Sequence, residues 1–104
     1  MQEYPIDMRK PWYHGSPLEL DILSEGSTIT QWKDLAQAFG TKPSQLGYNK
    51  IFSRISHNGT QKSILYTIDE SLEIGEDIYQ HPRTKMDIGV EFLTKRPFKL
   101  KRVL

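Results

Sequence analysis

The stretch Trp12-Tyr13-His14-Gly15-Ser16-Pro17 marks the start of the folded region and its first element. Trp12 and Tyr13 are aromatic residues of the kind that favours strands. Glycine and a Ser-Pro pair interrupt regular structure, so a turn is expected directly after them. The sequence therefore predicts a short aromatic strand with His14 at its end, where the backbone turns.

The residues before this stretch form a separate segment. Residues 1–11 are polar and carry Pro5 and Pro11, each of which disfavours helix at the residue before it. The chain has 104 residues, which is enough for one modest hydrophobic core. We therefore interpret residues 1–11 as an N-terminal arm and residues 12–104 as a single domain.

Three segments further along the chain have the composition of strands. Residues 63–68 are rich in strand formers, and residues 89–94 and 98–104 follow the same pattern. In the last segment the apolar residues are expected to face inward and the cations outward. Between the first two segments, residues 69–77 hold five carboxylates in nine residues and lead into a predicted polar loop at Tyr79–Pro82.

The middle of the chain allows two interpretations. The apolar residues there fall at helical spacing, which favours a helix capped by Gly40: Trp32, Leu35, Ala36 and Phe39. Alternatively, Phe39-Gly40-Thr41 is a strand that leads into a helix at residues 42–44, with Thr41 as its N-cap. Residues 43–55 then carry a patchy helical stripe broken by Gly47. Taken together, these elements predict a small α+β domain weighted toward β.

Composition excludes several classes of function. Fourteen Lys and Arg against thirteen Asp and Glu give a net charge of +1, so no strong field attracts nucleic acid or a membrane surface. The chain has no cysteine, which excludes disulfides, thiolate metal sites and a thiol nucleophile. No apolar run approaches the length of a membrane span and no signal-peptide core is present, so we expect a cytoplasmic protein.

Motifs for metal or hydrolytic chemistry are absent from the sequence. His14, His57 and His81 share no spacing typical of zinc ligands. There is no Gly-x-Ser-x-Gly nucleophile elbow and no glycine-rich phosphate loop followed by Lys-Ser/Thr. The sequence therefore predicts no metal site.

The segment Tyr13-His14-Gly15-Ser16 resembles the aromatic-His-Gly-Ser/Thr motif of the ADP-ribosyltransferase superfamily, and the small bacterial rifampin ADP-ribosyltransferases in particular. Further counterparts of that family's pattern follow in order at residues 24–28, 39–41, 64–70, 76–77 and 91–102. The resemblance covers residues 12–104. It implies an α+β fold with a split, mostly antiparallel β core and one or two helices. It also favours strand at residues 38–41.

The resemblance implies a role for each matching residue near NAD. His14 matches the histidine that hydrogen-bonds the nicotinamide ribose. Gly15 matches the glycine whose backbone binds the nicotinamide amide, and Ser16 lies beside it. Phe39 falls where the family usually has a tyrosine that stacks on the nicotinamide ring, and Thr41 belongs to the same counterpart segment. Phenylalanine departs from the family pattern at this position, although a stacking contact needs no hydroxyl.

Two acidic residues are candidates for the catalytic carboxylate. Asp77 aligns with the acidic residue that the rifampin enzymes carry late in the chain. Glu91, in Val90-Glu91-Phe92-Leu93, resembles the late-strand glutamate of the wider His-Tyr-Glu class. From the residues alone, Glu91 between Val90 and Phe92 is expected to point outward on a half-buried strand, where it would be only a surface charge. The sequence leaves the choice between Asp77 and Glu91 open.

The resemblance implies transfer of ADP-ribose from NAD, the substrate, to an unknown small-molecule or protein acceptor. A non-catalytic binding module on the same fold is the first alternative. The second is a small nucleic-acid-binding domain, which the near-zero net charge disfavours. Its contacts would come from Tyr48, Lys50, Lys95, Arg96, Lys99 and Lys101.

Overall fold

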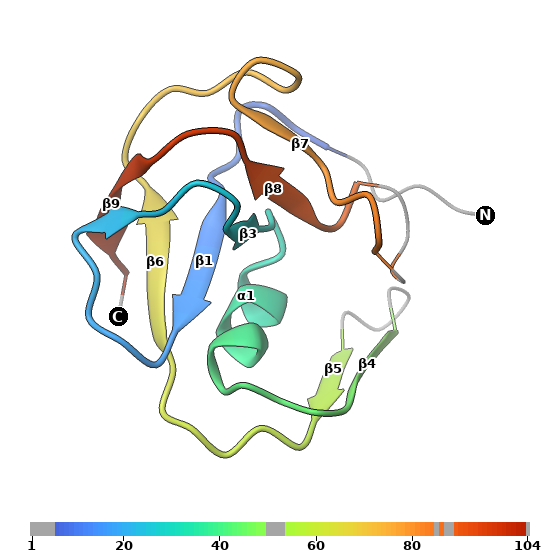
Figure 1. Ribbon diagram of the computed structural model, residues 1–104. Helices are drawn as coiled ribbons and strands as arrows, with labels where there is room; N and C mark the ends of the chain where they lie inside the picture. The colour runs from blue at the N-terminus through green and yellow to red at the C-terminus, as the bar shows by residue number, and fades with distance from the viewer. Residues whose placement is uncertain (1–5, 50–53, 85, 87–88, 104) are drawn as a thin grey trace.

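The larger sheet is built from segments that lie far apart in the sequence. The computed structural model describes residues 6–49, 54–84, 86 and 89–103. β1 (Tyr13–Ser16) pairs antiparallel with β6 (Ile64–Ile68), and β9 (Phe98–Arg102) pairs with β6 on its other side. β2 (Ile22–Leu23) completes a four-stranded sheet in the order β1-β6-β9-β2 (Figure 1).

A second, three-stranded sheet packs beside the first. β3 (Thr28–Ile29), β8 (Phe92–Thr94) and β7 (Ile78–Gln80) pair antiparallel in the order β3-β8-β7. Backbone hydrogen bonds of 2.7 and 3.1 Å between Tyr13 and Thr30 join β1 to the end of β3. The predicted α+β domain with mostly antiparallel sheets is confirmed at this level.

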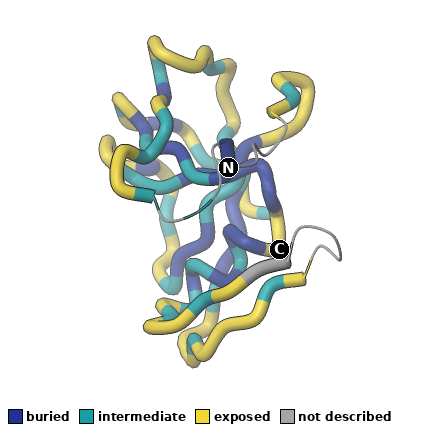
Figure 2. Tube along the Cα trace, turned by 90° about the vertical axis from the view of Figure 1, so that its right-hand side faces the viewer, coloured by how far each residue is buried: buried dark blue, intermediate teal, exposed yellow. Residues whose placement is uncertain are grey.

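The main hydrophobic core is shared by the two sheets. Its buried members come from β2 and β9 on one side and from β3, β7 and β8 on the other, with Trp12 just before β1. The Trp12 and Phe92 rings meet edge to face, with centroids 5.0 Å apart. The remaining members are Leu23, Ile29, Ile78 and Phe98. Figure 2 shows these buried segments running through the interior, with exposed loops around them.

The only helix in the described part of the chain is α1 (Lys33–Gly40), which packs on β1. The predicted strand at residues 38–41 is therefore wrong, and so is the helix beginning at residues 42–44. The helical spacing of the apolar residues decides the outcome, because it buries Leu35, Ala36 and Ala38 on one face. Thr41 is the C-cap residue of α1 rather than the N-cap of another helix.

Two glycines allow α1 and β1 to approach closely. A Cβ atom on Gly15 would lie 1.8 Å from the backbone oxygen of Ala36. A Cβ atom on Gly40 would lie 2.7 Å from the backbone nitrogen of Ser16. Gly40 therefore serves this contact, and Lys42 takes the left-handed conformation after the helix, with a φ of 55°.

The segment after α1 forms a β-hairpin instead of the predicted helical stripe at residues 43–55. β4 (Leu46–Asn49) pairs antiparallel with β5 (Arg54–His57). The pairing directs Leu46 and Ile55 against a second core cluster of Trp32, Leu35 and Val90. Tertiary packing has overridden a weak local helical pattern.

The Asn58 side chain stabilises the base of this hairpin, where residues 44–45 before β4 lie beside residues 58–59 after β5. Its side-chain oxygen accepts hydrogen bonds from the backbone N–H groups of Ser44 and Gln45 at 3.0 and 2.9 Å. Its side-chain nitrogen donates to Ser44 Oγ at 2.9 Å. The backbone N–H of Gly59 donates to His57 Nδ1 at 3.0 Å. The Asn58-Gly59 pair therefore closes the hairpin ends through side-chain contacts.

Of the strands after β5, three form in segments predicted to be strands, and β7 (Ile78–Gln80) was not predicted. β6, β8 and β9 form within the predicted segments 63–68, 89–94 and 98–104. β7 forms where the polar loop was predicted at Tyr79–Pro82, because fully buried Ile78 anchors it to the main core.

Candidate functional site

A cleft of about 450 Å³ opens where β1, the start of β3 and the C-terminal part of α1 meet. This volume lies within the range typical of small-molecule sites. The chain from Lys42 to Leu46 and the residue before β8 line its remaining sides. The cleft residues used below are His14, Gly15, Thr28, Phe39, Lys42 and Glu91.

His14 is the second residue of β1, and the turn follows Ser16 rather than His14 itself. Its Nδ1 lies 2.8 Å from the backbone oxygen of Thr28. Because a carbonyl can only accept, Nδ1 carries the hydrogen and Nε2 of the neutral ring is an acceptor. Nε2 has no protein partner among the residues that the structure describes.

Burial and a neighbouring charge keep His14 neutral. Burial lowers the pKa of His14 below its usual range, and the nearby Lys42 ammonium lowers it further. The hydrogen bond to Thr28 opposes these effects but does not reverse them. At neutral pH the cleft therefore presents an uncharged imidazole that can accept a hydrogen bond from a hydroxyl.

Phe39 brings an aromatic ring from α1 to the same cleft. It is half-buried and packs against the cluster of Trp32, Leu35 and Val90. Phe39 therefore belongs both to this packed cluster and to the lining of the cleft. Gly15 also lines the cleft, directly below the point where Ala36 approaches β1.

Glu91 supplies the carboxylate of the cleft. It precedes β8, is half-buried and lines the cleft instead of lying on an outer strand face. Its Oε1 lies 2.5 Å from Thr84 Oγ1, and its backbone oxygen accepts from the N–H of His81 at 3.0 Å. The structure thus brings together His14, Gly15, Phe39 and Glu91.

Ser16 and Thr41 do not line the cleft. Ser16 is buried, and its Oγ accepts from the backbone N–H of Leu18 at 3.0 Å. Thr41 Oγ1 donates to the backbone oxygen of Ala38 at 2.6 Å, at the end of α1. Both hydroxyls therefore serve the local backbone.

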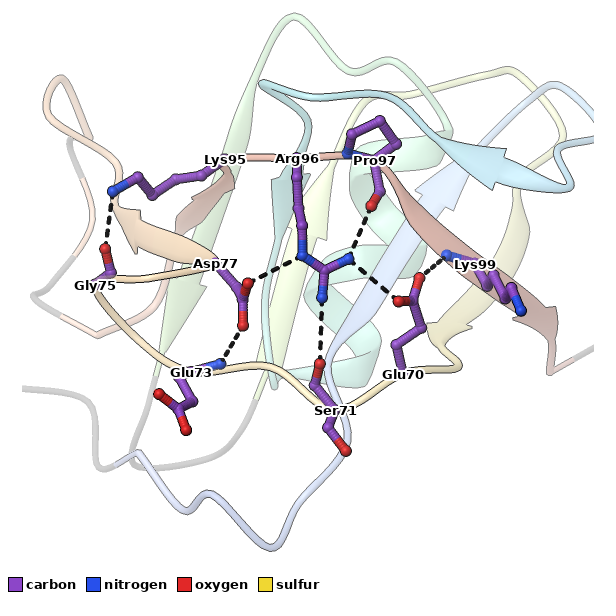
Figure 3. A network of polar contacts seen from close by, with 9 residues as sticks. All are labelled: Glu70, Ser71, Glu73, Gly75, Asp77, Lys95, Arg96, Pro97 and Lys99. Carbon is purple, nitrogen blue, oxygen red and sulfur yellow. Dashed lines mark hydrogen bonds and ion pairs between the residues drawn. The ribbon is translucent and has the colours of Figure 1, made fainter.

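Asp77 lies in a separate network around Arg96 (Figure 3). Arg96 Nε donates to Asp77 Oδ1 at 2.9 Å, and the backbone N–H of Glu73 donates to Asp77 Oδ2 at 2.8 Å. Arg96 also pairs with Glu70 at 3.2 Å and lies over the Phe98 ring. The hydrogen bond from Arg96 is the main cause that lowers the pKa of Asp77, and the hydrogen bond from the Glu73 backbone lowers this pKa further. Both carboxylate oxygens of Asp77 are thus occupied away from the cleft.

Lys42 and Thr28 are cleft residues that sequence reasoning missed. Lys42 follows the end of α1 and has no ion-pair partner within residues 6–49, 54–84, 86 and 89–103. Thr28 lies in the counterpart segment 24–28 but was given no role there, and no pattern marks Lys42, because the places of both residues depend on where α1 ends and how β3 pairs. A correct assignment of the helix would have placed Lys42 beside Phe39.

The cations proposed for nucleic-acid contact are partly engaged elsewhere. Lys95 Nζ donates to the backbone oxygen of Gly75 at 2.8 Å, and Arg96 is held in the network described above. Lys99 and Lys101 are exposed on β9. Lys50 and the side chain of Tyr48 lie outside the described residues.

Comparison of the chain with family models, curated proteins and solved structures gave no match. Within the described residues, no three His, Asp or Glu side chains gather in an arrangement that could hold a metal ion. In the described part of the chain, α1 is too short to cross a bilayer.

Proposed function

We propose that this chain binds NAD in the cleft beside His14 and transfers ADP-ribose to an acceptor, with release of nicotinamide. One observation carries the proposal: His14, Phe39 and Glu91, from three distant parts of the sequence, line the same cleft. These are the residues to which the resemblance gives the ribose, nicotinamide and carboxylate roles.

The reaction needs few protein groups. The bond between C1′ of the ribose and N1 of nicotinamide breaks, and its electron pair neutralises the pyridinium ring. The leaving group therefore requires no general acid. The acceptor oxygen or nitrogen forms a new bond to C1′ and loses its proton to solvent. With water as the acceptor, the products are ADP-ribose, nicotinamide and one proton.

Each cleft group suits one part of this reaction. Positive charge develops on the ribose as in glycoside cleavage, and the Glu91 carboxylate stabilises it. His14 Nε2 accepts a hydrogen bond from a ribose hydroxyl and so orients the sugar. The Phe39 ring stacks on nicotinamide. Lys42 places a positive charge in the same cleft, which suits the diphosphate of NAD.

The cleft favours Glu91 over Asp77 as the main carboxylate. Glu91 faces the cleft, and one of its oxygens has no partner within the described part of the chain. Asp77 has both oxygens occupied by Arg96 and Glu73. Recruiting Asp77 would require breaking the ion pair with Arg96.

The test is nicotinamide release from NAD by the purified protein, measured with calorimetric NAD binding. We expect Glu91→Gln to lower the rate by about a hundredfold or more, because it removes a charge that stabilises the transition state. His14→Ala should raise KM and lower kcat. Glu76→Gln changes an exposed carboxylate that does not line the cleft and should leave the rate unchanged.

The outcomes separate three conclusions. A wild-type protein that neither binds nor cleaves NAD at millimolar concentration contradicts the proposal. Binding of NAD without nicotinamide release would identify a non-catalytic binding module. RNA or DNA affinity with a steep salt dependence would favour the nucleic-acid alternative.

A further inference from the structure

Thr84 contacts the Glu91 carboxylate from the chain between β7 and β8. The backbone N–H of Met86 donates to Thr84 Oγ1 at 3.0 Å, and Thr84 Oγ1 lies 2.5 Å from Glu91 Oε1. An amide can only donate, and a hydroxyl carries one hydrogen. The Thr84 hydroxyl therefore accepts from Met86 and has its own hydrogen available to donate to Glu91 Oε1.

The backbone on both sides of Glu91 is also fixed. The N–H of His81 donates to the Glu91 backbone oxygen at 3.0 Å, and the N–H of Gly89 donates to Gln80 Oε1 at 2.9 Å. Val90, the residue before Glu91, is fully buried in the second core cluster. With the backbone held in this way, the Thr84 hydroxyl is the contact that sets the direction of the carboxylate.

We propose that Thr84 is a positioning residue for Glu91, an inference that rests on the proposed function. Thr84 holds Oε1, and Oε2 has no partner among the residues described. The free oxygen is then left to face the ribose as it gains positive charge. A carboxylate that rotates freely would spend part of its time away from this position, and such misplacement is costly in catalysis.

The experiment compares Thr84→Val with Thr84→Ser. Valine keeps the shape of the side chain and removes the hydroxyl, whereas serine keeps the hydroxyl. We expect Thr84→Val to lower kcat for nicotinamide release by about ten- to a hundredfold, with KM changed less than about twofold. Thr84→Ser should recover most of the lost kcat.

A matched control separates positioning from stability. Thr67 is another half-buried threonine, whose hydroxyl donates to the backbone oxygen of Trp12 at 3.0 Å and does not line the cleft. Thr67→Val should leave kcat unchanged. Thermal unfolding of every variant shows whether the assay contains folded protein.

The result distinguishes failure of this inference from failure of the proposed function. If the wild type releases nicotinamide and Glu91→Gln does not, an unchanged kcat in Thr84→Val contradicts the positioning role alone. The same holds if Thr84→Ser is as slow as Thr84→Val while both remain folded. A wild type that releases no nicotinamide, whether or not it binds NAD, overturns the proposed transfer and this inference together.

Discussion

The cleft beside His14 and the network around Arg96 use similar side chains in opposite ways. In the network, each nitrogen of the Arg96 guanidinium and each oxygen of the Asp77 carboxylate has a protein partner. In the cleft, His14 Nε2, one oxygen of Glu91 and the Lys42 ammonium have none within the described residues. Paired groups hold loops in place, whereas unpaired groups in a hollow can bind a ligand. The partners of a carboxylate therefore indicate its role better than its place in the sequence.

The largest effect is expected where the cleft rests on the contact between β1 and α1. Gly15→Val should lower the free energy of unfolding by more than about 3 kcal/mol, since its Cβ would overlap the backbone oxygen of Ala36. Denaturant unfolding followed by circular dichroism measures the loss. Gly26→Ala, where an added Cβ meets nothing within 4 Å, should cost much less despite a φ of 82°. Equal losses would contradict this account of the contact.

Acid should destabilise the cleft and the Arg96 network in separate steps. Burial lowers the pKa of folded His14, so the unfolded chain takes up a proton first. The contribution of His14 is present above its unfolded pKa of about 6.5 and is lost as the pH falls toward the lowered value. Denaturant unfolding at a series of pH values should show this step in the wild type but not in His14→Gln.

The second step belongs to the Arg96 network. Hydrogen bonds from Arg96 to Asp77, and from the Lys99 backbone to Glu70, lower the pKa of each carboxyl. Their contribution is present above about pH 4 and is lost as the pH falls through the lowered values. Arg96→Met should reduce this acid step and keep the upper one. A single step that both variants leave unchanged would contradict the assignment.

The smallest effect is expected at Lys42. Lys42→Met should raise KM for NAD by about three- to tenfold and leave kcat unchanged, because an exposed cation adds modest attraction for the diphosphate. Lys33→Met, at the start of α1, is the matched control and should keep the KM of the wild type. Steady-state nicotinamide release measures both. A fall in kcat without a change in KM would place Lys42 elsewhere in the mechanism.

The sequence predicted the elements whose local pattern and burial agree. β6 and β9 form where strand formers cluster. The helical spacing that gives α1 was one of two interpretations, and the resemblance wrongly favoured strand at residues 38–41. The β4–β5 hairpin and β7 could not be recognised, because their stability comes from distant partners such as the Trp32 cluster and the main core. Local secondary-structure propensity is a weak guide in these segments, because packing against distant residues determines their structure.

The candidate site also has residues that the sequence predicted and residues that only the fold reveals. The aromatic-His-Gly motif pointed to His14 and Gly15, which lie in the cleft. Asp77 and Glu91 could not be separated from sequence, because the choice depends on Arg96, nineteen positions after Asp77 and in contact with it. Lys42 was missed because its place in the cleft follows from the end of α1.

The contacts of Asn58 also affect the rate at which its side chain deamidates. An Asn-Gly pair is prone to deamidation through a succinimide, which forms when the glycine nitrogen attacks the asparagine side chain. Here the Gly59 nitrogen donates to His57, and the Asn58 amide is bound by Ser44 and Gln45. Isoaspartate should therefore accumulate in proportion to the fraction of molecules in which the hairpin base is open, and its rate of formation measures that local opening equilibrium.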